Sequence, residues 1–333
     1  MSLPPVLHRV WRFFCTYEPV RHARWELVVM RFLFAMLVWD TQTGWVAHLN
    51  DPPAILQAVL NNAQTGDIRY KSQPHPNGLA MWLDLTFFAN DAIEKPLRMA
   101  VAASLVLYVL GVPTVLSLLV PLVFGIGTST LSNSQGSIGH TSQVLHLTLL
   151  ALWLAGVWGV GCRIRKKPLP NGWSAGEFEA SWARQAIMAV YGVSALTKLV
   201  ISGGDWLSSA RYLPLHIVKS RDMKFYDNLD ASVLRYDWLP QLMMDHSLCF
   251  IIIFGLALPL ELFAFVGLYN RRSAALLGIA LILFHEVVTQ LMSLSFIFNK
   301  ALLLVFFVAP WWWLARLLGG RRQSESEMGI ASP

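Results

Sequence analysis

The chain has 333 residues, of which 55% are hydrophobic and only 14% are charged. Soluble globular domains carry about 25% charged residues, so this composition excludes an ordinary soluble protein and also a disordered or fibrous one. With 14 Trp and 18 Phe and a mean hydropathy of +0.49, the apolar surface exceeds what one water-soluble core of this size can bury. The composition therefore predicts a protein whose partner is the lipid bilayer.

The net charge of +6 does not indicate a nucleic-acid partner. The Lys and Arg residues are dispersed at the ends of apolar runs, which is the distribution that orients membrane proteins. Cys15, Cys162 and Cys249 lie far apart in the sequence and form no C-x-x-C pair. No metal site is therefore predicted. The first 25 residues contain no signal-peptide cleavage pattern.

Apolar runs predict the fold class. A helix that spans the bilayer needs about 20 mostly apolar residues. Eight segments approach this length, so the sequence predicts an all-α polytopic membrane protein with a bundle of about eight transmembrane helices. The expected spans are residues 26–48, 97–112, 113–131, 141–160, 181–200, 246–268, 273–294 and 300–318. Gly111 and Pro113 predict a tight turn between the second and third spans rather than a kink in one long helix.

The basic residues predict how this bundle is oriented. In an eight-span arrangement the N-terminal segment, two loops and the C-terminal tail lie on one side, and all four contain several Lys or Arg residues. These residues are Arg9, Arg12, Arg21, Arg24, Arg163, Arg165, Lys166, Lys167, Arg271, Arg272, Arg316, Arg321 and Arg322. Because cytoplasmic loops carry the excess of Lys and Arg, both termini are predicted to be cytoplasmic.

Three regions follow from these spans. Residues 1–25 are predicted to form a cytoplasmic segment that lies in the membrane interface. Residues 26–318 form the transmembrane domain, and residues 319–333 form a disordered cytoplasmic tail because they are short and polar. Residues 49–95 and 201–245 are expected to be long outer loops, each able to fold over the outer mouth of the bundle.

Ionisable residues inside apolar spans usually face the protein interior and are candidates for function. Tyr191, Ser194 and Lys198 follow helical spacing and share one face near the outer end of the fifth span. Two interpretations of Lys198 stay open. Its amine either extends to the membrane interface, or it is a desolvated general base whose neutral form burial favours. His140 opens the fourth span at the same outer level, where it is either a capping residue or a catalyst.

The seventh span contains His285, with Thr289 one turn beyond it. The string HEVVT lacks the second histidine of H-E-x-x-H and is therefore not a zinc-protease motif. This polar set is either a buried hydrogen-bonding network or the lining of a polar cavity. In the cytoplasmic half, Arg31 and Glu261 are expected at similar depths. We predict that they form a structural ion pair, because each charge alone would be costly there.

Several ordered segments resemble the membrane domain of the vitamin K-dependent gamma-carboxylase and its bacterial HTTM relatives. The resemblance covers about residues 26–313. It is carried by VMRFLFAMLVWD in the first span, G-H-T at the start of the fourth, RQAIMAVYGVSALTKLVISGGDW in the fifth, LPLELFAFVGL in the sixth, and LFHEVVTQLMSLSFIFNKALLLVFFVAP in the last two. The order of these segments, with Lys-Leu shortly before Asp-Trp, gives the resemblance its specificity.

The resemblance implies a lyase-type enzyme that uses vitamin K hydroquinone or menaquinol. Lys198 matches the family lysine that deprotonates reduced vitamin K, after which the quinol reacts with oxygen to give a strong base. That base removes a glutamate gamma-proton before carbon dioxide adds. His140 matches a histidine that assists the substrate step, and His285 one that lines the same cavity. The candidate cofactor contacts are Tyr191, Ser194 and Thr289. Arg31 and Glu261 match an arginine and an acidic residue of the family.

The chain also departs from the animal enzyme. That enzyme has a large soluble domain after its membrane part, and its double lysine is Thr197-Lys198 here. The substrate is therefore either a glutamate side chain or another exported peptide. An alternative function stays open, in which a non-catalytic accessory or maturation protein binds an exported peptide or a partner membrane protein through residues 49–95 and 201–245. The implied location is the bacterial inner membrane, with the active face outward.

Overall fold

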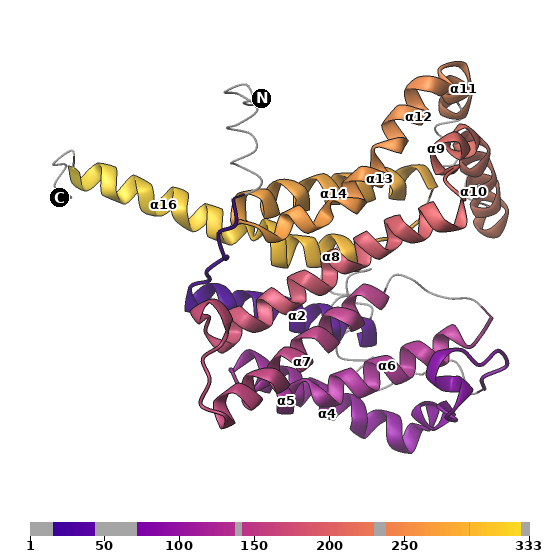
Figure 1. The fold of residues 1–333 in the computed structure, drawn as a ribbon. Helices are drawn as coiled ribbons and strands as arrows, with labels where there is room; N and C mark the ends of the chain where they lie inside the picture. Colours follow the sequence, from indigo (N-terminus) through magenta and orange to yellow (C-terminus); the bar gives the residue numbers. More distant parts are fainter. Residues whose placement is uncertain (1–15, 44–71, 137–141, 230–237, 293, 328–333) are drawn as a thin grey trace. The chain divides into compact units, whose positions relative to one another are not determined.

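The computed structural model describes residues 16–43, 72–136, 142–229, 238–292 and 294–327. All regular secondary structure in these residues is helical, which confirms the all-α class. The chain forms two compact units, which Figure 1 colours along the sequence. The larger unit comprises residues 19–184 and 304–333, and the smaller unit comprises residues 1–18 and 185–303. The chain passes from one unit to the other after Glu18, inside α8 (Ala175–Ile201) and again after Leu303.

The larger unit is a helical bundle in which α4 to α7 lie side by side (Figure 1) and α2 packs against α4. Its elements are α2 (Arg24–Thr43), η2 (Gly78–Met81), η3 (Thr86–Ala89), α4 (Asp91–Val109), α5 (Thr114–Ser117), α6 (Leu119–Asn133), α7 (Gln143–Ile164), η4 (Pro170–Gly172), the first part of α8, the π-helical η8 (Leu304–Val308) and α16 (Pro310–Glu327).

Aromatic rings fill the core of the larger unit. Phe34 of α2 is completely buried and packs edge-to-face on Tyr108 and Phe306, with ring centroids 6.3 and 5.8 Å away. Phe124 of α6 packs in the same manner on Phe88, at 5.8 Å. Edge-to-face contacts add to the energy of area burial. The first set of rings therefore holds α2, α4 and η8 together, and the second holds α6 against η3.

A turn separates α4 from α5, as the sequence predicts. Helix α4 ends at Val109, and Gly111 adopts a φ of 90°, which side chains other than glycine rarely tolerate. Pro113 then caps α5. The expected second and third spans are therefore two helices rather than one kinked helix.

The smaller unit is organised around α14 (Arg271–Met292), which contacts α10, α13, α15 and η7. Its other elements are the rest of α8, α9 (Trp206–Ser209), η5 (Ala210–Tyr212), α10 (Leu213–Asn228), α11 (Trp238–Asp245), α12 (Ser247–Gly255), α13 (Ala257–Leu262), η7 (Ala264–Leu268) and α15 (Ile297–Leu303).

The structure corrects the expected outer loop at residues 201–245, because much of it is helical. Helices α9, α10 and α11 occupy this segment. Ile217 of α10 and Met243 of α11 are each only 1% exposed. The packing of these few apolar side chains stabilises the helices, although most of the surrounding sequence is polar and gives no apolar run that would predict them. Of the other expected loop, residues 49–71 lie outside the described residues, and η2, η3 and the start of α4 lie in the remainder.

Four helices of the described residues are long and apolar enough to cross a membrane. They are Thr114–Asn133, Gln143–Ile164, Arg271–Met292 and Ile297–Leu318. The number rises to six if each of two bent pairs is one span, namely Ala175–Ile201 with Trp206–Asp227 and Trp238–Asp245 with Ser247–Leu262, the second pair being bent by 97°. Large apolar side chains such as Leu110 and Ile164 are about three-quarters exposed, as lipid contact requires.

Two of the eight expected spans are helices that contain more charged residues than is usual for a transmembrane segment. Helix α2 contains Arg24, Glu26, Arg31 and Asp40, and α4 contains four charged residues within its 19. Glu26 and Asp40 are buried. Both helices therefore exist where the sequence predicts them, but they are less apolar than a typical span.

The structure describes only part of each predicted terminal region. Residues 1–15 of the expected interfacial segment lie outside the described residues. The predicted disorder of residues 319–333 is wrong for most of this tail, because α16 continues as a helix through Glu327. Arg, Gln and Glu are good helix formers, so polarity does not end a helix that is already nucleated. Residues 328–333 are not among those described.

Gly156 of α7 tests the packing of the larger unit. A Cβ atom at this buried position would overlap the side chain of Thr114. We expect Gly156→Ala to lower the free energy of unfolding by about 1–3 kcal/mol, as overpacking does. Gly159→Ala is the matched control, because nothing lies within 4 Å of its added Cβ atom. The measurement is denaturant unfolding of the purified protein in detergent, and equal stability of the two variants would contradict the described packing.

Candidate functional site

The smaller unit contains most residues that the sequence singles out. Tyr191, Ser194 and Lys198 lie on α8, while His285 and Thr289 lie on α14. His140 lies outside the described residues. The structure therefore brings the predicted site residues of the fifth and seventh spans into one unit.

Tyr191 and His285 form a buried polar pair between α8 and α14. The Tyr191 hydroxyl lies 2.8 Å from His285 Nε2, and the two residues are only 2% and 4% exposed. The His285 ring stacks on Phe296, with centroids 4.5 Å apart. This packing fixes the orientation of the imidazole ring.

The second nitrogen of His285 is chemically available. Nδ1 is buried and has no hydrogen-bond partner among the described residues. If Tyr191 donates to Nε2, then Nδ1 carries a proton and is a donor; if Nε2 donates to Tyr191, then Nδ1 is an acceptor. An unsatisfied buried polar atom costs about 1–3 kcal/mol. A ligand that hydrogen-bonds to Nδ1 would recover this energy.

Lys198 forms an ion pair with Glu261 of α13 through Nζ and Oε2. Glu261 is 4% exposed, whereas the side chain of Lys198 retains 25% of its exposure. The ammonium group also lies 5.3 Å from the centre of the Trp206 ring. Lys198 is therefore held in place by a carboxylate and an aromatic face rather than extending freely to the interface.

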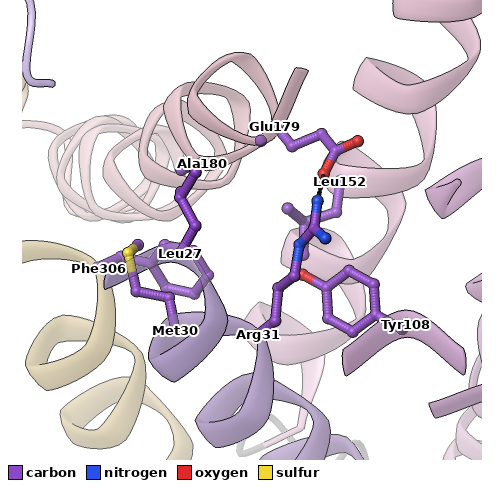
Figure 2. A pocket seen from close by; sticks show the side chains of 9 residues that line it. Leu27, Met30, Arg31, Tyr108, Leu152, Glu179, Ala180 and Phe306 are labelled. Atoms are coloured by element: carbon purple, nitrogen blue, oxygen red, sulfur yellow. Dashed lines mark hydrogen bonds and ion pairs between the residues drawn. The ribbon is translucent and has the colours of Figure 1, made fainter. Parts of the chain in front are cut away.

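The ion pair predicted between Arg31 and Glu261 is wrong, because each residue has a different partner. Arg31 Nη2 donates to Glu179 Oε2 at 3.2 Å, and Thr114 donates to the other oxygen of Glu179 at 2.8 Å. Figure 2 shows this pair beside the Tyr108 ring, whose centre is 5.5 Å from the guanidinium carbon. Sequence reasoning missed Glu179 because the fifth span was expected to begin at residue 181, whereas α8 begins at Ala175.

A small cavity surrounds the Arg31–Glu179 pair in the larger unit (Figure 2). It encloses about 250 Å³, including the part that is open to its surroundings. Its lining consists of Leu27, Met30, Arg31, Tyr108, Leu152, Gly176, Glu179, Ala180 and Phe306. The two charges neutralise each other, and apolar side chains make up most of the remaining lining. We therefore interpret the Arg31–Glu179 contact as a structural ion pair in a packed core.

A second ion pair of the smaller unit connects α14 to α15. Lys300 Nζ lies 2.6 Å from Glu286 Oε2, and Gln290 donates to the other carboxylate oxygen at 2.8 Å. The Lys198–Glu261 ion pair and the Tyr191–His285 pair lie in the same unit, and we call these four side chains the polar network. The Lys300–Glu286 pair is a separate ion pair, and Glu286 follows His285 directly in the sequence.

Thr289 and Ser194 are the two remaining predicted cofactor contacts, and they differ in their hydrogen bonding and position. Thr289 donates its hydroxyl to the backbone oxygen of His285 at 2.7 Å, so its proton is engaged within α14. Ser194 is half-buried on α8. Among the described residues, no three His, Cys, Asp or Glu side chains are placed to hold a metal ion together. The Lys198–Glu261 ion pair and the Tyr191–His285 hydrogen bond can each hold a proton between two groups.

No protein-family model, no curated protein and no solved structure matches this chain. The polar network in the smaller unit is consequently the strongest structural argument about function. Lys300, which pairs with Glu286 outside this network, was not among the predicted site residues. The short connection between α14 and α15 brings the two helices together and could have suggested this pair.

Tyr191→Phe tests the buried pair. The variant removes the hydroxyl and leaves a second nitrogen of His285 without its partner, so we expect a loss of about 1–3 kcal/mol in the free energy of unfolding. Tyr108→Phe is the matched control. Tyr108 is equally buried, at 3%, but its hydroxyl has no hydrogen bond to any described residue. Equal losses for both variants in denaturant unfolding would show that the Tyr191–His285 bond contributes nothing specific.

Proposed function

We propose that this protein is a vitamin K-dependent gamma-carboxylase-like membrane enzyme. It uses a quinol and oxygen to generate a strong base, which modifies an exported peptide. The observation that carries the proposal is the Lys198–Glu261 ion pair, which belongs to the same polar network as the buried Tyr191–His285 pair. The order of sequence segments that resemble the carboxylase family, with Lys198 at the position of the base, supports it further.

The residues present fit a quinol head group. A quinol is a flat ring with two hydroxyl groups, and such ligands bind among aromatic side chains with a few oriented polar atoms. His285 Nδ1 is a buried polar atom with no described partner, and Phe296 and Phe284 pack on the His285 ring. When bound, reduced vitamin K or menaquinol would supply, with oxygen, the strongly basic species.

Lys198 and Glu261 can together accept a proton. Glu261 Oε2 would first take a proton from the Lys198 ammonium group, which leaves a neutral amine with a free lone pair, and this amine would then accept a proton from a bound quinol. The lysine is a cation before and after the two transfers, and Glu261 changes from a carboxylate to a carboxylic acid. The positive charge therefore returns to Nζ, where it would stabilise a neighbouring anion.

The other members of the network orient this reaction. Tyr191 fixes one nitrogen of His285, so that Nδ1 offers a single hydrogen bond in a set direction. Trp206 covers Lys198 and limits the conformations of its side chain. Such preorganisation lets proton transfer proceed without rearrangement of the site.

The proposal includes a location. We place eight spans and cytoplasmic termini on the apolar runs and the distribution of basic residues, and an outward-facing site in the bacterial inner membrane on the resemblance to bacterial relatives. The apolar helices of the structure are compatible with lipid contact. An exported peptide would then reach Lys198 from the outer side, where a glutamate or another side chain is modified.

Removal of Lys198 tests the chemistry. We expect the purified protein to convert reduced vitamin K or menaquinol to its epoxide in the presence of oxygen. Lys198→Ala should reduce this rate by at least about 100-fold, the contribution typical of a general base. Epoxide is measured by chromatography under single-turnover and steady-state conditions.

Lys300→Ala is the matched control, because both lysines are ion-paired and each retains 25% side-chain exposure. Removing one charge of a buried pair can also destabilise the fold. Lys198→Ala is therefore repeated in a Glu261→Gln background, which leaves no uncompensated charge. Normal epoxide formation by a folded Lys198→Ala protein would refute Lys198 as the base. Failure of the folded wild type with every quinol would instead favour the accessory-protein alternative.

Glu261→Gln tests the proton acceptor. The amide still hydrogen-bonds to Lys198 but cannot accept its proton, so we expect kcat for epoxide formation to fall roughly 10- to 100-fold with little change in KM for the quinol. Glu286→Gln, in the neighbouring ion pair, should leave kcat unchanged. An unaltered kcat in Glu261→Gln would assign Glu261 a purely structural role.

A further inference from the structure

The turn between α7 and α8, in the larger unit, carries four exposed cations. Arg163 lies in the last turn of the apolar helix Gln143–Ile164, and Arg165, Lys166 and Lys167 follow directly after it. None of the four side chains has a hydrogen bond or an ion pair with a described residue. Four positive charges within five residues therefore face the surroundings without an acidic partner.

The end of α7 fixes the backbone under these cations. The N–H of Lys167 donates to the carbonyl of Cys162 at 2.9 Å, and that of Lys166 donates to Arg163 at 3.1 Å. Lys166 has a φ of 53°, the left-handed conformation that usually belongs to glycine at a helix C-terminus. The chain thus reverses at Lys166 and holds the flanking basic residues on one short, ordered turn.

The following residues are also tied down. Arg21 donates to the backbone oxygens of Asn171 and Gly172 at 2.6 and 3.1 Å, and it keeps 56% side-chain exposure. Asn171 again adopts a positive φ, of 55°. These hydrogen bonds therefore fix the backbone around the basic turn without a bound ligand.

Aromatic and apolar side chains lie next to the basic turn. Trp158, one to two turns before the end of α7, is 56% exposed and packs near Trp182 of α8 at 6.4 Å. Phe178 connects Trp182 to Trp173 through ring contacts of 5.8 and 6.4 Å. Ile164, between the cations, is 76% exposed. Exposed tryptophan beside cations at the end of an apolar helix is typical of the membrane–water interface.

We infer that this turn, residues 163–167 with Trp158, is a binding surface for the phosphate head group of an anionic phospholipid. The Lys and Arg side chains contact the phosphate, and Trp158 and Ile164 contact the upper part of the acyl chains. Juxtamembrane clusters of four or more basic residues attract anionic lipids in this manner. Nucleic acid would satisfy the charges equally well, but it would leave the exposed Ile164 and Trp158 in water.

The experiment compares lipid binding to the full-length protein in detergent. Phosphatidylglycerol or phosphatidylcholine is added, and the bound lipids are counted by native mass spectrometry. We expect Lys166→Gln/Lys167→Gln to weaken phosphatidylglycerol binding roughly tenfold at low salt, because each basic residue near an anionic surface contributes substantially. Phosphatidylcholine binding should not change. High salt should weaken the binding of phosphatidylglycerol to the wild type, since exposed charges are screened.

Two controls decide the interpretation. Lys166→Arg/Lys167→Arg keeps the charge and should retain binding. Arg211→Gln/Lys219→Gln removes two exposed cations of the smaller unit and should leave binding unchanged. Equal losses in this pair and in Lys166→Gln/Lys167→Gln, or no loss in either, would overturn the inference. Preferential binding of single-stranded DNA over phosphatidylglycerol would overturn it as well. Thermal unfolding of each variant in detergent separates lost binding from lost folding.

Discussion

Charges inside apolar helices must be neutralised by a nearby partner, and the organisation of both units depends on this constraint. An isolated charge in a low-dielectric interior is far more costly than an ion pair with satisfied hydrogen bonds. In the larger unit, Arg31, Glu179 and Thr114 connect α2, α8 and α5. In the smaller unit, Lys198 and Glu261 connect α8 to α13. Each pair therefore fixes which helices can lie together.

The two ion pairs differ in what remains available around them. Both oxygens of Glu179 are engaged by protein donors, and apolar side chains line most of the cavity around its pair. The unit that contains the Lys198–Glu261 pair also contains His285, whose buried Nδ1 has no hydrogen-bond partner among the described residues. A saturated pair stabilises a fold, whereas an unsaturated network can bind a ligand and exchange protons. This difference is why the proposed chemistry is placed in the smaller unit.

The proposed chemistry and the basic turn make different demands on the protein. Proton transfer requires groups whose positions are fixed by packing, which Phe296 and Tyr191 provide for His285. Attraction of a lipid head group requires charges that remain accessible, and the four exposed cations at residues 163–167 have no ion-pair partner in the part of the chain that the structure describes. The buried Tyr191–His285 pair thus lies in the smaller unit, and the exposed cations lie on the turn after α7 in the larger unit.

The sequence by itself determined the helical class, most of the helix positions, the turn at Gly111 and the residues worth examining on α8 and α14. These features depend on local composition and spacing, because apolar runs and backbone preferences act over a few residues. The sequence did not predict α10 and α11, because these helices are stabilised by a few buried apolar side chains rather than by a continuous apolar pattern.

Only the tertiary structure decided which charges pair. Depth along an expected span places Arg31 and Glu261 at similar levels, but it contains no information about which helices are neighbours or which faces they turn to each other. Glu179 and Lys198 were the actual partners because side-chain contact is decided within a few ångströms of three-dimensional space. The same reason explains why the sequence could propose Tyr191 and His285 as site residues without revealing their hydrogen bond, or the free nitrogen that it leaves.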